Sequence, residues 1–267
     1  MNWFKAAIRA SGVCLVLAMV PLACGAKKSD MWSDMKAAED AARIRTSKTL
    51  LAYMSLETMF PDRRVRLLAS AASEGQLAEV ERLIAEGVDV NARGTQNATP
   101  LFWSMNNLSG FRKLLEHGAD PNVVYGDGGT VMHWAARDED PAFLQAALQH
   151  GGNPHLVAGV FMRTPLFNAI GSNEAAIELL LSAGADIDAK DGDGDTAAMT
   201  AAGRGRFDVV YLFLSRGASY SVMNNSGFGL LDRIADKRGA FIPGSEHERW
   251  LDKVIEWFDE RGVQIPE

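Results

Sequence analysis

Residues 164–170 read TPLFNAI, and residues 184–188 read GADID. Related strings recur along the chain, as TPLFWSM (99–105), TVMHWAA (130–136) and TAAMTAA (196–202), and as GVDVN (87–91), GADPN (118–122), GGNPH (151–155) and GASYS (217–221). The first glycines of the second kind of string lie 31, 33, 33 and 33 residues apart. A spacing this regular predicts an array of repeated helical units.

The repeated residue types have clear local roles. A Thr before an apolar, Ala-rich stretch predicts the start of a helix, because its hydroxyl accepts a free backbone N–H. Pro in the first turn has its φ angle preset and loses no needed donor. Gly87, Gly118, Gly151, Gly184 and Gly217 are expected to end the second helix of each unit in a left-handed conformation.

This combination resembles the ankyrin repeat, which has a β-turn and two helices in about 33 residues. The resemblance covers residues 62 to about 262 and implies an all-α solenoid of about six helix–turn–helix repeats with β-turn tips. In that family a histidine on the first helix ties neighbouring repeats together. Only His133 matches it here. Phe102, Phe167 and Met199 take its place elsewhere, so packing is expected to replace the polar tie.

The predicted repeats are 62–93, 94–124, 125–155, 156–189, 190–222 and a divergent C-terminal cap at 223–267, which carries an insertion at 236–246. A solenoid needs such a cap because its last repeat has no neighbour. Residues 35–61 have apolar positions at helical spacing. They are interpreted as an N-terminal helical cap, with a partner-binding helix as the alternative.

The stretch AKDGDGDTAAM (189–199) has aspartates at alternate positions, which invites a calcium loop as an interpretation. A helix–loop–helix calcium site needs Gly at position 6 and Glu at position 12 of the loop. Counted from Asp191, these positions hold Thr196 and Ala202. The stretch aligns instead with the turn between ankyrin repeats, so a turn is expected, with metal binding as the alternative. No cofactor is expected.

The first 24 residues are typical of an export signal. Lys5 and Arg9 precede a short apolar segment at 13–20, which is too short to span a bilayer. The residues that follow it, LACG at 22–25, resemble the lipobox of bacterial lipoproteins, in which the cysteine is acylated. Pro21 stands where an aliphatic residue is usual in that motif. We therefore expect a signal peptide at 1–24, lipidation at Cys24 and a tether at 25–34. Ordinary cleavage near Gly25 is the alternative.

This signal predicts the periplasmic face of the outer membrane as the location, with a soluble periplasmic protein as the alternative.

The composition and the motifs of the chain reduce the number of function classes to consider. The 267 residues include 47% hydrophobic residues, and 27 Lys and Arg oppose 34 Asp and Glu. Without a basic cluster, nucleic acid is not an expected partner. Both cysteines lie in the first 24 residues, and no nucleophile elbow, phosphate loop or His-Glu-x-x-His motif occurs. The sequence therefore predicts a non-enzymatic protein.

Ankyrin proteins usually bind partners through the tips and the residues that end the first helices. Carried over to this chain, the resemblance implies a contact surface of Thr95, Gln96, Ala98, Trp103, Asn106, Asn107, Asp127, Trp134, Arg137, Asp138, Val160, Phe161, Arg163, Ser172, Asp193, Asp195 and Arg204. For the two tryptophans, half-buried packing is the alternative. The tip LVAGVFMRT (156–164) is unusually apolar, which favours either an anchor for a partner or packing on the next turn.

The predicted function is protein binding after export. The chain resembles periplasmic ankyrin proteins, some of which are immunity proteins that neutralise toxins delivered by type VI secretion. Its partner would then be a secreted toxin, and its membrane contact a lipid on Cys24. Two alternatives stay open: an accessory protein or scaffold that supports an envelope or stress-defence enzyme, and a structural envelope lipoprotein.

Overall fold

The structure is a computed structural model that describes residues 55–126, 128–171 and 174–266. Its helices are α2 (Leu56–Met59), α3 (Arg63–Glu74), α4 (Leu77–Ala85), the 3-10 turn η1 (Thr95–Asn97), α5 (Pro100–Trp103), α6 (Leu108–Glu116), α7 (Val131–Arg137), α8 (Ala142–Gln149), α9 (Pro165–Ala169), α10 (Glu174–Ser182), α11 (Ala197–Gly203), α12 (Phe207–Ser215), α13 (Leu230–Ala235) and α14 (Glu246–Asp259). The predicted signal peptide, tether and residues 35–54 of the N-terminal cap lie outside the described residues.

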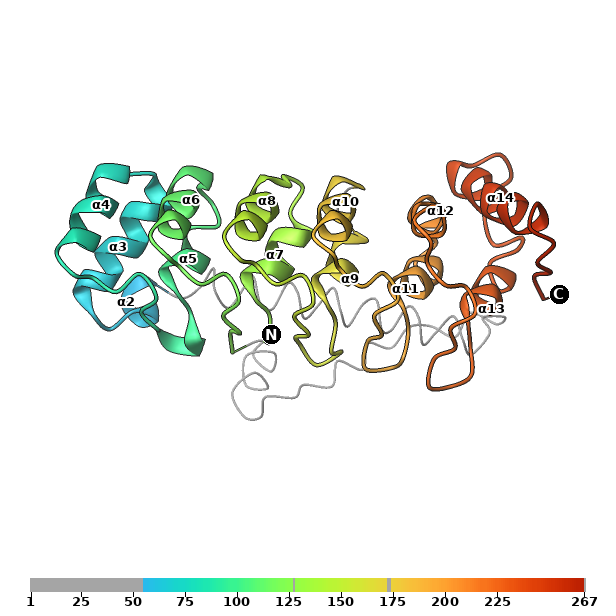
Figure 1. Ribbon diagram of the computed structural model, residues 1–267, viewed down its shortest axis with the longest axis horizontal. Coiled ribbons are helices and arrows are strands. Elements are labelled where there is room, and N and C mark those ends of the chain that lie inside the picture. Colours follow the sequence, from blue (N-terminus) through green and yellow to red (C-terminus); the bar gives the residue numbers. More distant parts are fainter. Residues whose placement is uncertain (1–54, 127, 172–173, 267) are drawn as a thin grey trace, which may run out of the picture. The chain divides into compact units, whose positions relative to one another are not determined.

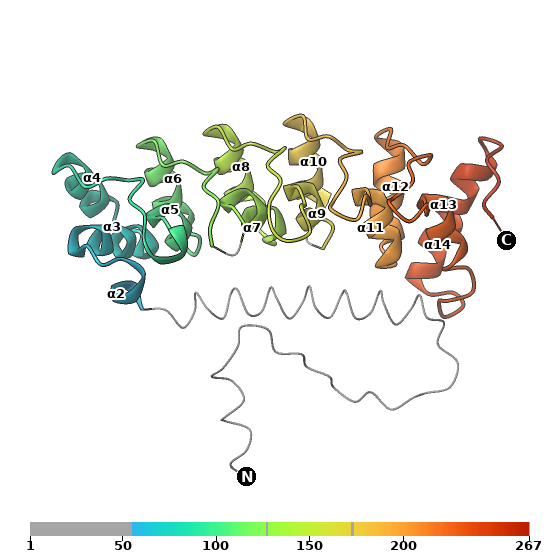
Figure 2. The same cartoon turned by 90° about the horizontal axis from the view of Figure 1, so that it is seen from below.

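The helices form two layers (Figures 1 and 2). The first helices of successive repeats pack side by side, as α3 does on α5, α7 on α9 and α11 on α13. The second helices form the other layer, in which α4 packs on α6, α6 on α8 and α12 on α14. One helix pair lies within each of the six predicted repeat ranges. The described chain is an all-α solenoid, as the sequence predicted.

The helix boundaries follow the repeated Thr and Gly residues. The hydroxyls of Thr99, Thr130 and Thr196 each accept the backbone N–H three residues later, which confirms their predicted capping role. Thr164 starts α9 without this bond, and its buried Oγ1 has no hydrogen-bond partner within the described ranges, so the capping prediction is wrong for its hydroxyl. The five repeat glycines adopt φ angles of 83° to 88°, the left-handed conformation expected after a helix.

The core lies between the layers and continues from repeat to repeat. Its largest fully buried side chains include Phe60, Phe111, Phe167, Phe213 and Phe258. Phe111 of α6 meets Phe143 of α8 edge to face, with ring centroids 5.2 Å apart. Because each repeat alone leaves such a side chain uncovered, stacking of neighbours supplies the burial that stabilises the fold.

Two kinds of polar contact also tie neighbours together. Asn91 donates to the carbonyl of Gly118 and accepts from the N–H of Asp120. Asn122 repeats this pattern with Gly151 and Asn153 one repeat later. These two asparagines lie in the loops that follow the second helices. They fasten the first three repeats through side-chain bonds to backbone.

His133 makes the family's tie between repeats. Its Nδ1 lies 2.7 Å from the hydroxyl of Thr130, and its Nε2 lies 2.9 Å from the carbonyl oxygen of Arg163 in the next repeat. The consistent assignment has the Thr130 hydroxyl donating to Nδ1 and Nε2 donating to the carbonyl. This confirms the role that the resemblance implied for His133.

Helix α14 packs on the repeat before it. Leu251, Val254 and Phe258 of α14 are buried against the preceding repeat. The insertion that precedes α14 folds back, because Phe241 packs edge to face on Phe207 with centroids 5.9 Å apart. Its burial is one-sided, and the capping role stays a prediction.

Candidate partner-binding surface

Five hairpin loops, which we call tips 1 to 5, precede the first helices of repeats 2 to 6. They comprise residues 94–98, 125–129, 158–163, 191–195 and 224–228. Each tip is closed by a backbone hydrogen bond between its end residues, for example from the N–H of Asp191 to the carbonyl of Asp195 at 2.9 Å. The tips lie together along one edge of the described repeats (Figure 1).

Most neighbouring tips are hydrogen-bonded to each other. The N–H groups of Gly126, Gly192 and Asn225 donate to the carbonyls of Gln96, Phe161 and Asp193, respectively, at 2.7 to 3.0 Å. These bonds join tip 1 to tip 2, and tips 3, 4 and 5 in succession, so the position of one tip constrains its bonded neighbour.

Buried ion pairs hold tip 4. The Asp191 side chain is 0% exposed, and its carboxylate accepts from Arg163 Nε at 3.0 Å and from the backbone N–H groups of Asp193 and Asp195. Asp195 pairs with Arg233 of α13 at 2.8 Å and accepts from Asn224. These contacts account for two of the three aspartates as parts of a turn. Within the described ranges, no group of three His, Cys, Asp or Glu residues is arranged to hold a metal ion.

Apolar side chains are concentrated at the tips. Nine large hydrophobic residues are exposed in the described part of the chain. Six of them lie in a tip or directly before one: Val124, Val157, Val160, Met162, Met223 and Phe228. Val160 is the most exposed of these, at 60%. Because exposed apolar groups that gather in one region mark interaction sites, the tips are the best candidate surface for a partner.

Tip 3 differs from the other tips in its backbone. Its end residues enclose four residues, 159–162, whereas the others enclose three. The last enclosed position has a positive φ in every tip, and Asn97, Gly128, Gly194 and Gly227 occupy it elsewhere. In tip 3 it holds Met162, at φ 51°. A side chain with Cβ costs roughly 1 kcal/mol or more in this region, so the chain holds an exposed Met against a local preference for Gly.

The first-helix face supplies a second part of the surface. The same helical position, four residues after the capping residue, holds Trp103, Trp134, Asn168, Thr200 and Arg233 in successive repeats. Both tryptophans are partly buried, and Trp134 meets Phe102 edge to face with centroids 6.0 Å apart. The position changes from aromatic in repeats 2 and 3 to polar in repeats 4 to 6.

The structure distributes the predicted contact residues over three environments. Thr95, Gln96, Asn106, Val160, Asp193 and Arg204 are exposed. Trp103, Asn107, Trp134, Arg137, Asp138, Phe161 and Arg163 are partly buried. Ala98 and Asp195 are buried, at 2% and 6% exposure, and are therefore left out of the surface proposed below. Asp127, Ser172 and Cys24 lie outside the described residues.

Sequence reasoning missed Met223 and Phe228, which are 52% and 54% exposed beside tip 5. The available signal was two large apolar residues within VMNNSGFG (222–229), a stretch otherwise rich in Asn and Gly.

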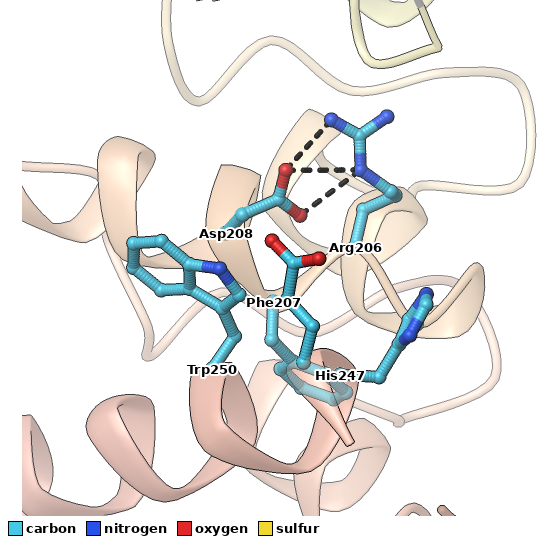
Figure 3. Close-up of a pocket in the computed structure, with 7 residues that line it drawn as sticks. Arg206, Phe207, Asp208, His247 and Trp250 are labelled. Atoms are coloured by element: carbon cyan, nitrogen blue, oxygen red, sulfur yellow. Dashed lines mark hydrogen bonds and ion pairs between the residues drawn. The ribbon is translucent and has the colours of Figure 1, made fainter.

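A small pocket lies between the turn before α12 and the start of α14 (Figure 3). Gly205, Arg206, Phe207, Asp208, Glu246, His247 and Trp250 line it. Arg206 Nη2 lies 2.7 Å from Asp208 Oδ2, and Arg206 also donates to the carbonyl of Ile170. Burial raises the pKa of Asp208, but the hydrogen bonds and charge of Arg206 outweigh burial and hold that pKa below its ordinary value. The two charged groups satisfy each other, so the pair serves the packing of repeats 4 to 6.

None of the helices in the described ranges has both the length and the apolar character that a membrane span requires.

Comparison with known proteins agrees with this architecture. A family model described as ankyrin repeats in three copies matches residues 126–224. The putative palmitoyltransferase ZDHHC13 of Danio rerio is 28% identical over 216 residues, which cover 76% of this chain and 32% of that protein. Palmitoyltransferase ZDHHC13 of Homo sapiens is 28% identical over 175 residues, or 51% of this chain and 28% of that protein.

A bacterial relative is similar over a shorter stretch. Protein PhlB of Serratia liquefaciens is 31% identical over 132 residues, which cover 48% of this chain and 58% of that protein. This chain spans about a third of the length of the palmitoyltransferases that it matches. The repeated strings, the helix pairs and the family match agree: the chain contains ankyrin repeats, and its described helices form an all-α ankyrin solenoid.

Proposed function

We propose that the chain is a non-enzymatic protein-binding module that works after export, and most specifically an immunity protein that neutralises a secreted toxin. Ankyrin repeats imply protein partners. The observation that carries the proposal is the gathering at the tips of six of the nine large apolar side chains that are exposed in the described part of the chain. Burial of such side chains by a partner would add about 25 cal/mol for each Å² removed from water.

The export part of the proposal rests on residues 1–25. In it, the signal segment directs the chain out of the cytoplasm, and acylation of Cys24 holds it at the periplasmic face of the outer membrane. Each buried methylene of an acyl chain contributes about 0.8 kcal/mol to membrane attachment. A protein held there would meet an incoming toxin before the toxin reaches its target. Palmitoyltransferase activity is not proposed for this chain, because the chain spans only about a third of the length of the palmitoyltransferases that it matches.

The test is capture of the partner from cells that export the protein. The full chain with a C-terminal tag is expressed in its source organism, crosslinked and purified from the envelope, and bound proteins are identified by mass spectrometry. We expect one stoichiometric partner encoded beside this gene, and protection from that partner's toxicity when the two are co-expressed in the periplasm. A resident envelope enzyme as the stoichiometric partner would overturn the immunity proposal in favour of an accessory role.

A point variant locates the surface. Val160→Asp places a charge at the most exposed of the six tip side chains and is expected to reduce partner affinity at least tenfold, with no change in melting temperature. Leu67→Asp is the matched control, because Leu67 is 42% exposed on α3, outside the tips. Equal loss of affinity in both variants would contradict binding through the tips.

Lipidation is tested separately with Cys24→Ala, which should release the protein from membranes.

A further inference from the structure

Helix α7 exposes only two side chains to solvent. Of its residues 131–137, Trp134 and Arg137 are partly buried and all the others are buried. Residues three apart on a helix are neighbours on one face. These two side chains therefore form the whole surface that α7 offers at the centre of the first-helix layer.

Arg137 differs from the other half-buried arginines of the described chain. Arg163 pairs with Asp191, Arg206 with Asp208 and Arg233 with Asp195, at 2.7 to 3.0 Å. Arg66 donates to the backbone carbonyls of Phe60 and Pro61. Arg137 makes no hydrogen bond or ion pair with any residue in the described ranges. Its five N–H donors thus have no protein acceptor there.

Burial lowers the pKa of Arg137, and burial is the only cause of that shift. Arginine nevertheless keeps its charge in proteins. Among the neighbouring acids, Asp138 accepts from the N–H of Asp140, and Asp140 accepts from the N–H of Ala142. The position of Arg137 in the last turn of α7 favours a cation through the helix dipole, although this effect is typically below about 1 kcal/mol.

The surroundings would strengthen a charged hydrogen bond made by Arg137. Trp134 lies one turn before it, and its buried Nε1 finds no acceptor within the described residues. The Trp134 ring packs on Phe102, which in turn lies 4.5 Å from the ring of Tyr125, centroid to centroid. An aromatic environment lowers the local dielectric, and a carboxylate matches the planar fork of a guanidinium with two parallel hydrogen bonds.

We propose that Arg137 binds a carboxylate of the protein partner, the side chain of an Asp or Glu, whose stem packs on Trp134. This deepens the proposed protein-binding function and rests on it. The net charge of −7 repels a strongly acidic partner. The recognised segment therefore carries a single acid in an otherwise neutral or basic sequence, and the carboxylate sets the register of the partner on the first-helix face.

The test uses the full chain and a displayed library of random twelve-residue peptides, so it does not depend on knowing the natural partner. Wild-type protein is expected to enrich peptides with an Asp or Glu at a fixed place among apolar or basic residues. Replacing that acid by Asn or Gln should weaken binding to the wild type at least tenfold. The same replacement should change binding to Arg137→Met less than twofold.

Two further variants make the result specific. Arg137→Lys keeps the charge but loses the planar fork, and is expected to give an intermediate loss. Arg112→Met is the matched control, because Arg112 is an exposed arginine on α6 in the other helix layer, and it should behave as the wild type. Melting temperatures of all variants should match that of the wild type, since Arg137 makes no hydrogen bond or ion pair to the described residues that a substitution could remove.

Two outcomes would overturn the inference: enriched peptides without a fixed acid, or an acid-to-amide loss that is as large on Arg137→Met as on the wild type. Neither would touch the proposed function, which fails instead if the envelope capture yields no protein partner. Capture of a partner with equal affinity for the wild type and Arg137→Met would likewise leave protein binding standing and remove the role of Arg137.

Discussion

The first three repeats share neutral asparagine bonds to backbone, whereas buried ion pairs join the last three at the tips. Asn91 and Asn122 link repeats 1 to 3 through neutral bonds to backbone in exposed loops. Arg163, Asp191, Asp195 and Arg233 link repeats 4 to 6 through ion pairs at the tip edge. Neutral bonds at the surface are replaceable by water, whereas a buried charge that loses its partner is not. The two halves should therefore respond unequally to loss of a single side chain.

The largest effect is expected from Asp191→Ala. Its carboxylate is fully buried and holds Arg163 and two backbone N–H groups. Removing one member of a buried pair typically costs about 3–5 kcal/mol. Urea unfolding followed by hydrogen exchange should show the loss in repeats 4 to 6 first. Asp193→Ala is the control, because Asp193 is exposed. An Asp191→Ala protein as stable as this control would disprove the structural role of the pair.

A smaller effect is expected from Asn122→Ala in the first half. The variant loses two hydrogen bonds that join repeats 3 and 2, each contributing roughly 1 kcal/mol or less at an exposed site. Thermal unfolding should therefore report a loss of about 1–2 kcal/mol. Asn106→Ala serves as control, since Asn106 is exposed and caps no helix. A cost equal to that of Asp191→Ala would erase the proposed contrast between the halves.

Met162→Gly tests the boundary between the halves. Gly removes the strain of a left-handed Met but adds chain entropy to the unfolded state, so a net gain of about 0.5–1 kcal/mol is expected. The same exchange at Met223, which has no positive φ, should lower stability instead. Partner affinity of Met162→Gly should fall, because the exposed side chain is lost. Lower stability for both variants would argue against strain at Met162.

The smallest effect is expected from extending the asparagine pattern. His155 stands at the place that Asn91 and Asn122 hold in repeats 1 and 2. His155→Asn offers the same pair of bonds to the carbonyl of Gly184 and the N–H of Asp186, with a gain of up to about 0.5 kcal/mol. Differential scanning calorimetry would compare it with His155→Ala. No difference between the two would show that the neutral pattern depends on loop geometry particular to the first half.

Much of the fold could be predicted because its signals are local. Thr99, Thr130 and Thr196 begin helices through bonds to a backbone N–H three residues away, and the repeat glycines end helices through their own φ angles. Such signals need no knowledge of distant residues. The candidate surface was predicted only in outline, because the sequence identified the apolar tip 3 but gave no measure of its exposure and missed Phe228.

The sequence by itself therefore determined the period, the helix pairs and the place of the tips. Only the tertiary structure decided which side chains of a tip face solvent and which charges find partners. Arg163 and Asp191 are 28 residues apart and Asp195 and Arg233 are 38 apart, so each pair forms only when repeats stack. Arg137 ends α7, yet stacking brings it no carboxylate from the described residues. Side-chain pairing depends on the facing repeat, and that information is not contained in the motif that repeats.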